Sequence, residues 1–282
     1  MKEDFKDFIE ASGLLKYEPA TISKIYRKNP KRLFKRLWQT LIPIFAYIVS
    51  VGFDKITGKL KNESQARYRA KQLTALLVEL GPAFVKAGQA LSTRPDIIPV
   101  VLLEELSQLQ DQLPGFSGDK AMELIEKDLD KNINDIFLKI DKDPISAASL
   151  GQVHKAILKD GEVVAVKVQR PGLREQITLD LYIVRNIAIW LKNNIGLIRS
   201  DLVALIDELG KRVFEEMDYI NEAENAEKFR NMHQKNIKIA VPKIYNELTS
   251  RRVLTMEWIE GTKLTNLDDV KKLGIDPDEM ID

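Results

Sequence analysis

The hydrophobic pattern of the chain changes its period once, at Asp143-Pro144. Before this point apolar residues recur every three or four positions, which predicts amphipathic helices. After it, apolar residues alternate with others in short runs, which predicts strands. This order predicts an α+β fold in which helices precede a small antiparallel sheet. The helices expected in the first part cover residues 62–80, a stretch from Pro82 onward, 102–109, and 121–129 with Ser117 as its cap.

The second part of the chain carries the expected sheet. A hairpin is predicted from strands at 153–157 and 163–169, joined through the turn at Asp160-Gly161. A third strand is expected at 252–258. Long helices are expected between the hairpin and the third strand, at 173–191 and, beginning from a cap at Ser200, at 200–232.

The strand at 163–169 contains Val164-Ala165-Val166-Lys167. Because side chains alternate along a strand, Ala165 and Lys167 share one face, and a small residue beside a lysine suits a flat heterocycle and its phosphates. In kinase folds such a lysine holds the α- and β-phosphates of a nucleotide and is itself held by a glutamate on a helix. Glu222, on the expected helix 200–232, is the candidate partner. Taken alone, the strand motif fits a solvated lysine as well.

Composition excludes several kinds of site. The chain has no cysteine, which excludes disulfides, thiolate zinc sites and iron–sulfur ligation and fits a reducing compartment. His154 and His233 are too few for a histidine metal cluster, and His154 is expected to be a half-exposed strand residue. The net charge of +1 argues against a nucleic-acid binder. The acidic start of the chain lacks the features of a signal or transit peptide, so we expect a cytoplasmic protein.

An uncharged run at 38–53 follows a cluster of basic residues. The run is shorter than the roughly 20 residues that a membrane-spanning helix needs, and Pro43 is expected to interrupt it. Two interpretations remain open: a buried helix docked on the main domain, or an interfacial anchor whose lysines face anionic lipid headgroups, which would make the protein peripheral at a membrane. The basic cluster comprises Lys24, Arg27, Lys28, Lys31, Arg32, Lys35 and Arg36.

Six segments of the chain occur in the order found in the UbiB/AarF family of atypical kinases, and the chain resembles that family over nearly its whole length. Each segment alone is a modest signal, whereas six in order are highly specific. The N-terminal region and residues 250–266 are most similar to the cyanobacterial and plastid branch. The segments are LGPAFVKAGQ (80–89), STRPD (92–96), PISAASLGQ (144–152), VAVK with QRPG (164–172), EMDYINEA (216–223) and LTMEWIEG (254–261).

The resemblance implies a role for each candidate residue. The phosphate-binding pair would be Lys167 and Glu222, and the segment 257–259 would be the hinge whose backbone meets adenine. An alanine-rich loop would replace the glycine-rich loop of ordinary kinases. The KxGQ motif would reach into the nucleotide cleft and restrict access of protein substrates. The residues implied are Ala165, Lys167 and Glu222 at the phosphates, Ala147, Ala148 and Ser149 in the loop, Glu257, Trp258 and Ile259 in the hinge, Lys86 and Gln89 in KxGQ, and Glu216 and Asp218 in ExD.

These motif residues also have simpler interpretations. The acidic residues Glu216, Asp218 and Glu222 fit a solvated helix face, since most acidic clusters on helices are exposed. Lys86 and Gln89 fit a role in capping neighbouring carbonyl groups. The spacing alone does not choose between these interpretations and the functional ones.

The resemblance further implies a kinase-like small lobe at 143–262, preceded by a helical KxGQ region at 61–142 and an N-terminal extension at 1–60. Neither an HxD nor a DFG motif occurs in these 282 residues, so the large lobe is expected to be largely missing, with only its start at 263–282. ATP or ADP with Mg²⁺ is the implied cofactor, bound weakly or not at all by this chain alone, with no metal site in it.

The implied activity is phosphoryl transfer or ATP hydrolysis linked to prenylquinone lipid metabolism. The alternative is a non-catalytic module that binds nucleotide or membrane lipid or complements a separate second lobe, or an incomplete gene product.

Overall fold

The computed structural model describes residues 13–96, 98–110, 113–194, 201–236, 239–262, 267–272 and 274. Its sheet is antiparallel throughout, as the alternating pattern predicts, and it includes the predicted hairpin and third strand. Two short strands at its edge were not predicted, because they are too short to show a period. The strands run in the order β1 (Phe137–Ile140), β3 (Gly151–Leu158), β4 (Val163–Gln169) and β5 (Val253–Glu257), and β2 (Ser146–Ala147) pairs with β3.

The two faces of the sheet are covered differently. Val164, Val166 and Val168 of β4 are fully buried in a core that they share with helix α7 (Gly118–Leu129). Because side chains alternate along the strand, Lys167 stands on the opposite face. Helix α11 (Tyr219–His233) packs near that face against β5. The apolar side of β4 therefore fixes which side its lysine occupies.

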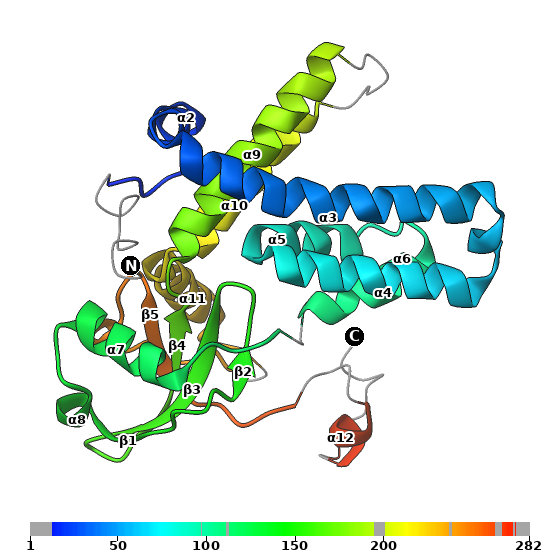
Figure 1. The fold of residues 1–282 in the computed structure, drawn as a ribbon. Coiled ribbons are helices and arrows are strands. Elements are labelled where there is room, and N and C mark those ends of the chain that lie inside the picture. The colour runs from blue at the N-terminus through cyan, green and yellow to red at the C-terminus, as the bar shows by residue number, and fades with distance from the viewer. Residues whose placement is uncertain are drawn as a thin grey trace.

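The part of the chain before the sheet is helical, as predicted. Helices α4 (Glu63–Leu80) and α5 (Pro82–Ser92) are separated at Gly81, whose φ of 107° lies outside the range that other residues adopt easily. Pro82 occupies the first helical position of α5, where its missing N–H costs nothing. Figure 1 shows α3 (Pro30–Ile56) lying along α4, with α5 and α6 (Val100–Ser107) beside them.

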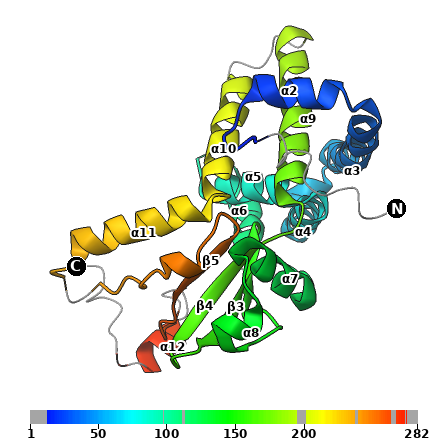
Figure 2. The same cartoon turned by 90° about the vertical axis from the view of Figure 1, so that its left-hand side faces the viewer.

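The predicted helix at 200–232 is wrong, because the structure has two helices there. Helix α10 (Leu202–Glu216) ends before Asp218, which adopts an extended conformation and caps α11 by accepting a hydrogen bond from the amide of Ile220 at 3.2 Å. Figure 2 shows α10 running beside α9 (Leu173–Asn194) and α11 leaving it toward the sheet. Ser200 lies outside the described residues, and Asp201 caps α10.

Helix α3 is continuous through Pro43, so the expected interruption is wrong. Pro43 removes one backbone hydrogen bond, to the carbonyl of Gln39, which is exposed and can be hydrated. Among the described residues, α3 is the one helix long and apolar enough to cross a membrane by length and composition. It contacts α4 and α9, yet Thr40 and Asp54 are its only buried residues, so its interpretation as a buried helix is also wrong.

Two smaller expectations are wrong. Ser117 precedes α7, but its side chain makes no capping hydrogen bond. His154 is fully buried rather than half-exposed. Its Nδ1 donates to the carbonyl of Asp141 at 2.8 Å, and its Nε2 accepts from the amide of Gln152 at 3.0 Å. Burial lowers the pKa of His154 below its ordinary value, which keeps the ring neutral.

The remaining short elements connect these layers. They are α2 (Pro19–Arg27), α8 (Ile133–Ile136), α12 (Leu267–Lys272), and the 3₁₀ turns η1 (Lys59–Lys61), η2 (Gln108–Gln110) and η3 (Asn246–Leu248).

Arg36 ties three helices together. Its guanidinium donates to both carboxylate oxygens of Asp180 on α9, at 2.6 and 2.8 Å, and to the last carbonyl of α4, that of Leu80. The side chain of Asp180 is completely inaccessible, and burial raises its pKa above the ordinary value while Arg36 opposes that shift. The bidentate ion pair therefore offsets the free-energy cost of burying the carboxylate of Asp180 away from water.

We predict that Arg36→Leu lowers the free energy of unfolding by about 3–5 kcal/mol, because it leaves the carboxylate of Asp180 buried without a cation. Urea denaturation at neutral pH measures this loss. The matched control is Arg212→Leu, which breaks a solvent-exposed ion pair with Glu208 and should cost less than about 1 kcal/mol. Equal losses in the two variants would contradict the role given to Arg36.

Candidate functional site

Lys167 on β4 and Glu222 on α11 form an ion pair. The ammonium of Lys167 donates to both carboxylate oxygens of Glu222, at 2.7 and 2.8 Å. The side chains are 22% and 38% exposed, so the pair lies at the edge of the protein and is open to a ligand. Glu222 lies in the first turn of α11 because Asp218 begins the helix just before it. The contact that the spacing predicts is therefore present, while its role at a nucleotide stays a prediction.

Tyr219 lies beneath this pair. Its ring centroid is 4.7 Å from the ammonium of Lys167, which gives the cation an aromatic face as well as a carboxylate. The residue is fully buried, and its hydroxyl has no hydrogen-bond partner among the described residues. Burial, with the nearby carboxylates of Glu222 and Glu216, raises the pKa of Tyr219 above its ordinary value. The hydroxyl is therefore neutral and unsatisfied.

The first residue of β3, Gly151, lies close to this tyrosine. A Cβ atom at Gly151 would lie 2.6 Å from the hydroxyl of Tyr219 and 2.4 Å from the carbonyl oxygen of Val168. Only glycine fits there, although the rest of the loop is rich in alanine. The amide of Ala148 donates to the carbonyl of Gly151 at 2.8 Å and closes the loop.

The KxGQ residues have separate partners. Lys86 on α5 forms an ion pair with Glu216 at the end of α10. Gln89 donates from its side-chain amide to the carbonyl of Leu109 at 2.8 Å, so the capping interpretation describes Gln89 but not Lys86. Asp218 is occupied as the cap of α11, with Arg251 at 3.8 Å.

A cavity of about 490 Å³, here called the Lys86–Lys167 cavity, brings most of these side chains together. Its walls come from α5, the alanine-rich loop, β4 and α10. Thr93, Leu209 and Arg212 also line the cavity, and the sequence did not predict them as site residues. Arg212 could have been predicted, because it lies one helical turn before Glu216 and so shares its helix face. The predicted residues that line it are Lys86, Gln89, Ala148, Ser149, Lys167 and Glu216.

Other predicted residues lie outside this cavity. Ala147 is paired with Gln152 in the sheet, and Ala165 is buried opposite Met256. At the hinge, the amide of Trp258 donates to the carbonyl of Val163 at 3.1 Å and is therefore not available to a purine. The carboxylate of Glu257 accepts from the amide of Lys243 at 3.1 Å, and Ile259 is 42% exposed. Of the three hinge residues, Glu257 and Ile259 are exposed and Trp258 is half-buried.

No group of three or more His, Asp or Glu side chains suited to a metal ion occurs among the residues that the structure describes. The cavity places a lysine that is held by a carboxylate beside the alanine-rich loop.

The family comparison agrees with this geometry. The family described as the ABC1 atypical kinase-like domain matches residues 108–282, which is more than half of the chain. The chain belongs to the ABC1 atypical kinase family. The antiparallel sheet with its lysine–glutamate pair accordingly belongs to a kinase-like fold.

Relatives of this ABC1 chain come from cyanobacteria and plastids. The protein sll0005 of Synechocystis is 48% identical over 94% of the chain. Protein ACTIVITY OF BC1 COMPLEX KINASE 3, chloroplastic, of Arabidopsis thaliana is 42% identical over 92% of the chain. The chain spans 39% of the first relative and 36% of the second. The predicted similarity to the cyanobacterial and plastid branch is confirmed.

The solved structures similar to the ABC1 chain include a complex of Rv3197 with erythromycin from Mycobacterium tuberculosis. The two chains are 31% identical, with a TM-score of 0.49. The match covers 76% of this chain and 53% of the other.

We predict that Tyr219→Phe leaves the free energy of unfolding unchanged or raises it by up to about 1–2 kcal/mol, because it removes a buried hydroxyl that has no partner. The matched control is Tyr26→Phe, since the hydroxyl of Tyr26 bonds Thr178 at 2.8 Å and the carbonyl of Glu175 at 3.1 Å. That variant should lose about 1 kcal/mol. Chemical denaturation compares the two, and a larger loss for Tyr219→Phe than for Tyr26→Phe would contradict the unsatisfied state of the hydroxyl.

Proposed function

We propose that this ABC1 chain supplies the nucleotide-binding face of an ATP-dependent phosphotransferase or ATPase. The observation that supports it most is the bidentate pair of Lys167 and Glu222 at the edge of a cavity that the alanine-rich loop also lines. A lysine held in this way offers a fixed positive charge to phosphate oxygens and needs no reorganisation when they arrive.

Each element has a distinct part in the proposal. Lys167 neutralises phosphate charge and Glu222 orients it. The loop at 147–149 closes over the phosphates with less freedom than glycines would give, since alanine restricts φ. Ile259 offers backbone groups to adenine in place of the engaged amide of Trp258. Mg²⁺ arrives bound to the phosphates of the nucleotide.

Lys86 and Glu216 serve as a gate in the same proposal. Their ion pair joins α5 to α10 across the wall of the Lys86–Lys167 cavity. While the pair is closed, a protein substrate cannot approach the phosphates from that side. The further link to prenylquinone lipid metabolism rests on the family resemblance alone.

The experiment is a thermal-shift titration of the 282-residue polypeptide with Mg-ATP and Mg-ADP. We expect weak, saturable stabilisation in the wild type, about tenfold weaker in Lys167→Ala because a charge-assisted contact to phosphate is lost. The matched control is Lys139→Ala on β1, whose side chain is 67% exposed and pairs with Asp141, and this variant should leave the affinity unchanged.

Two results would contradict the proposal. The absence of any shift in the wild type would favour the rival interpretation, a non-catalytic interaction module. Equal affinities in the wild type and Lys167→Ala would place the nucleotide elsewhere.

We also expect no ATP turnover, since the 282 residues contain neither an HxD nor a DFG motif. Measured ATP hydrolysis by the polypeptide would contradict that expectation.

We also propose that α3 contacts a membrane surface. Ile42, Phe45, Val49 and Phe53 recur at helical spacing and are 57%, 68%, 52% and 59% exposed. The basic residues at the start of the helix, with Lys31 and Lys35 both exposed, suit anionic headgroups. This arrangement supports a peripheral location at a membrane, whichever compartment holds the protein.

We expect the chain to sediment with vesicles that contain phosphatidylglycerol and to bind phosphatidylcholine vesicles more weakly, because the lysines add electrostatic attraction. Phe45→Glu with Phe53→Glu should reduce binding at least about tenfold. Phe229→Glu on α11, at a residue 47% exposed, is the control and should bind as the wild type does. Vesicle binding that is unaffected by the α3 changes would contradict this role.

A further inference from the structure

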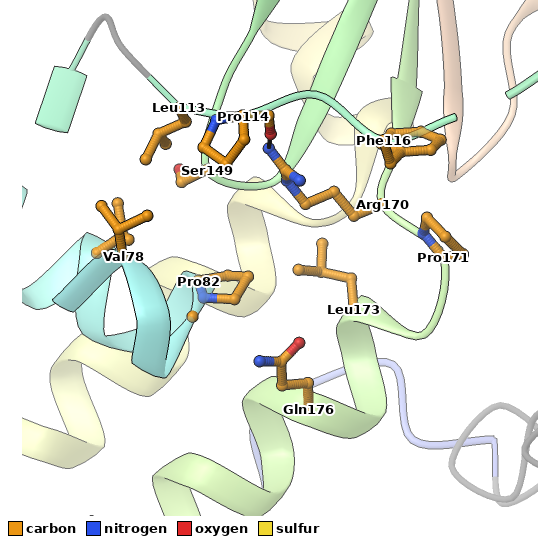
Figure 3. Close-up of a pocket in the computed structure, with 12 residues that line it drawn as sticks. Val78, Pro82, Leu113, Pro114, Phe116, Ser149, Arg170, Pro171, Leu173 and Gln176 are labelled. Atoms are coloured by element: carbon orange, nitrogen blue, oxygen red, sulfur yellow. Dashed lines mark hydrogen bonds between the residues drawn. The ribbon is translucent and has the colours of Figure 1, made fainter. Parts of the chain in front are cut away.

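A second cavity, here called the Arg170 cavity, lies between the helical region and the sheet lobe. Its volume is about 230 Å³. Figure 3 shows Val78 and Pro82 on one side of it, Pro114 and Ser149 above, and Arg170, Leu173 and Gln176 on the other side. Most of the side chains around it are apolar. Of the candidate nucleotide-site residues described above, Ser149 lines this cavity and Lys167 and Glu222 do not.

Arg170 brings a positive charge to this cavity, and none of the described carboxylates pairs with it. Its Nη2 donates to the carbonyls of Pro114 at 2.6 Å and Ala148 at 2.9 Å, and its Nε donates to Ala148 at 3.2 Å. These acceptors are neutral, and no described carboxylate forms an ion pair with the guanidinium. Burial lowers the pKa of Arg170 below its ordinary value, because it partly removes the guanidinium from water. The Nη1 group has no acceptor among the described residues.

Two further donors around the cavity are unused. Ser149 is 4% exposed, and no described residue forms a hydrogen bond with its hydroxyl. The side-chain amide of Gln176, which lies over Gly81, also has no partner among the described residues. Helix α5 begins at Pro82 in the wall, so the positive end of its dipole lies there as well. Ser149 is buried and Gln176 is half-buried, and both line the cavity, so their donors are within reach of a ligand that fills it.

We propose that the Arg170 cavity binds a small organic acid, a single carboxylate on an apolar body. The carboxylate supplies the missing anion for Arg170 and an acceptor for Ser149 and Gln176. The apolar body fills the space between Val78, Pro82 and Leu173. A volume of about 230 Å³ is below the roughly 300–1,000 Å³ of drug-sized sites, so the ligand is of the size of one ring with a short side chain.

The position of this cavity relates it to the proposed nucleotide site. Ser149 lines both the Arg170 cavity and the Lys86–Lys167 cavity. A ligand in either one therefore contacts the same loop. Helix α5 also contributes to both walls, through Pro82 and Val85 in one and Lys86 in the other. The acid-binding inference rests on the Arg170 cavity alone and does not require nucleotide binding.

The experiment is isothermal titration of the full chain with 3-phenylpropionate and, in parallel, with its neutral amide 3-phenylpropionamide. The two probes have nearly the same shape, so their difference reports the charge. We expect saturable binding of the acid and about tenfold weaker binding of the amide, because a charge-assisted hydrogen bond is lost. Acetate, which lacks the apolar body, should bind at least about tenfold more weakly than the acid.

Two variants locate the site. Val78→Phe fills the cavity and should abolish binding, while Val100→Phe, at a residue 66% exposed, is the matched control and should bind as the wild type does. Ser149→Ala removes one donor and should weaken binding about three- to tenfold. The thermal unfolding midpoint of each variant shows that it is folded.

Equal affinities for the acid and the amide would overturn the proposal, since the guanidinium would then play no part. Binding that survives Val78→Phe in a folded protein would overturn it as well, because the acid would occupy another surface. No binding of 3-phenylpropionate at millimolar concentration, in a wild-type chain with a cooperative thermal transition, would exclude an acid of this class.

Discussion

The placement of Lys167 on the open face of β4 is the constraint on which the rest of the site depends. Val164, Val166 and Val168 bury the other face against α7. A slip of one residue in the pairing with β3 or β5 would turn the lysine into that core and the valines toward the cavity. The register that pairs Lys167 with Val153 and Leu254 therefore also determines that its ammonium meets Glu222.

The helical region determines what surrounds that ammonium. The helical conformation breaks at Asp218, between α10 and α11. As a result Glu216 pairs with Lys86 on α5, while Glu222 pairs with Lys167 on the sheet. Arg36 holds α3 and the end of α4 against α9, and this fixes the start of α5. One short stretch of sequence thus carries two carboxylates to two different lysines. The same arrangement leaves the Arg170 cavity between the helices and the alanine-rich loop.

Much of this arrangement was predictable from the sequence. Helices and strands with a clear period, such as α4 and β4, follow from the spacing of leucines and valines, and the pair of Lys167 and Glu222 follows from their motifs. The break at Asp218 was missed because apolar residues continue with helical spacing across it, whereas its cap depends on a local hydrogen bond. The continuity of α3 through Pro43 depends on solvent access to Gln39. The burial of His154 depends on Gln152 and Asp141, which only the fold brings together.

The central claim is that Lys167, held by Glu222, binds nucleotide phosphate. A crystal structure of the chain soaked with a non-hydrolysable ATP analogue and Mg²⁺ tests this claim most directly. The account predicts phosphate oxygens within hydrogen-bonding distance of the ammonium of Lys167, with its contact to Glu222 retained and residues 147–149 beside the phosphates. A nucleotide bound elsewhere, with the Lys167–Glu222 pair facing only solvent, would contradict it.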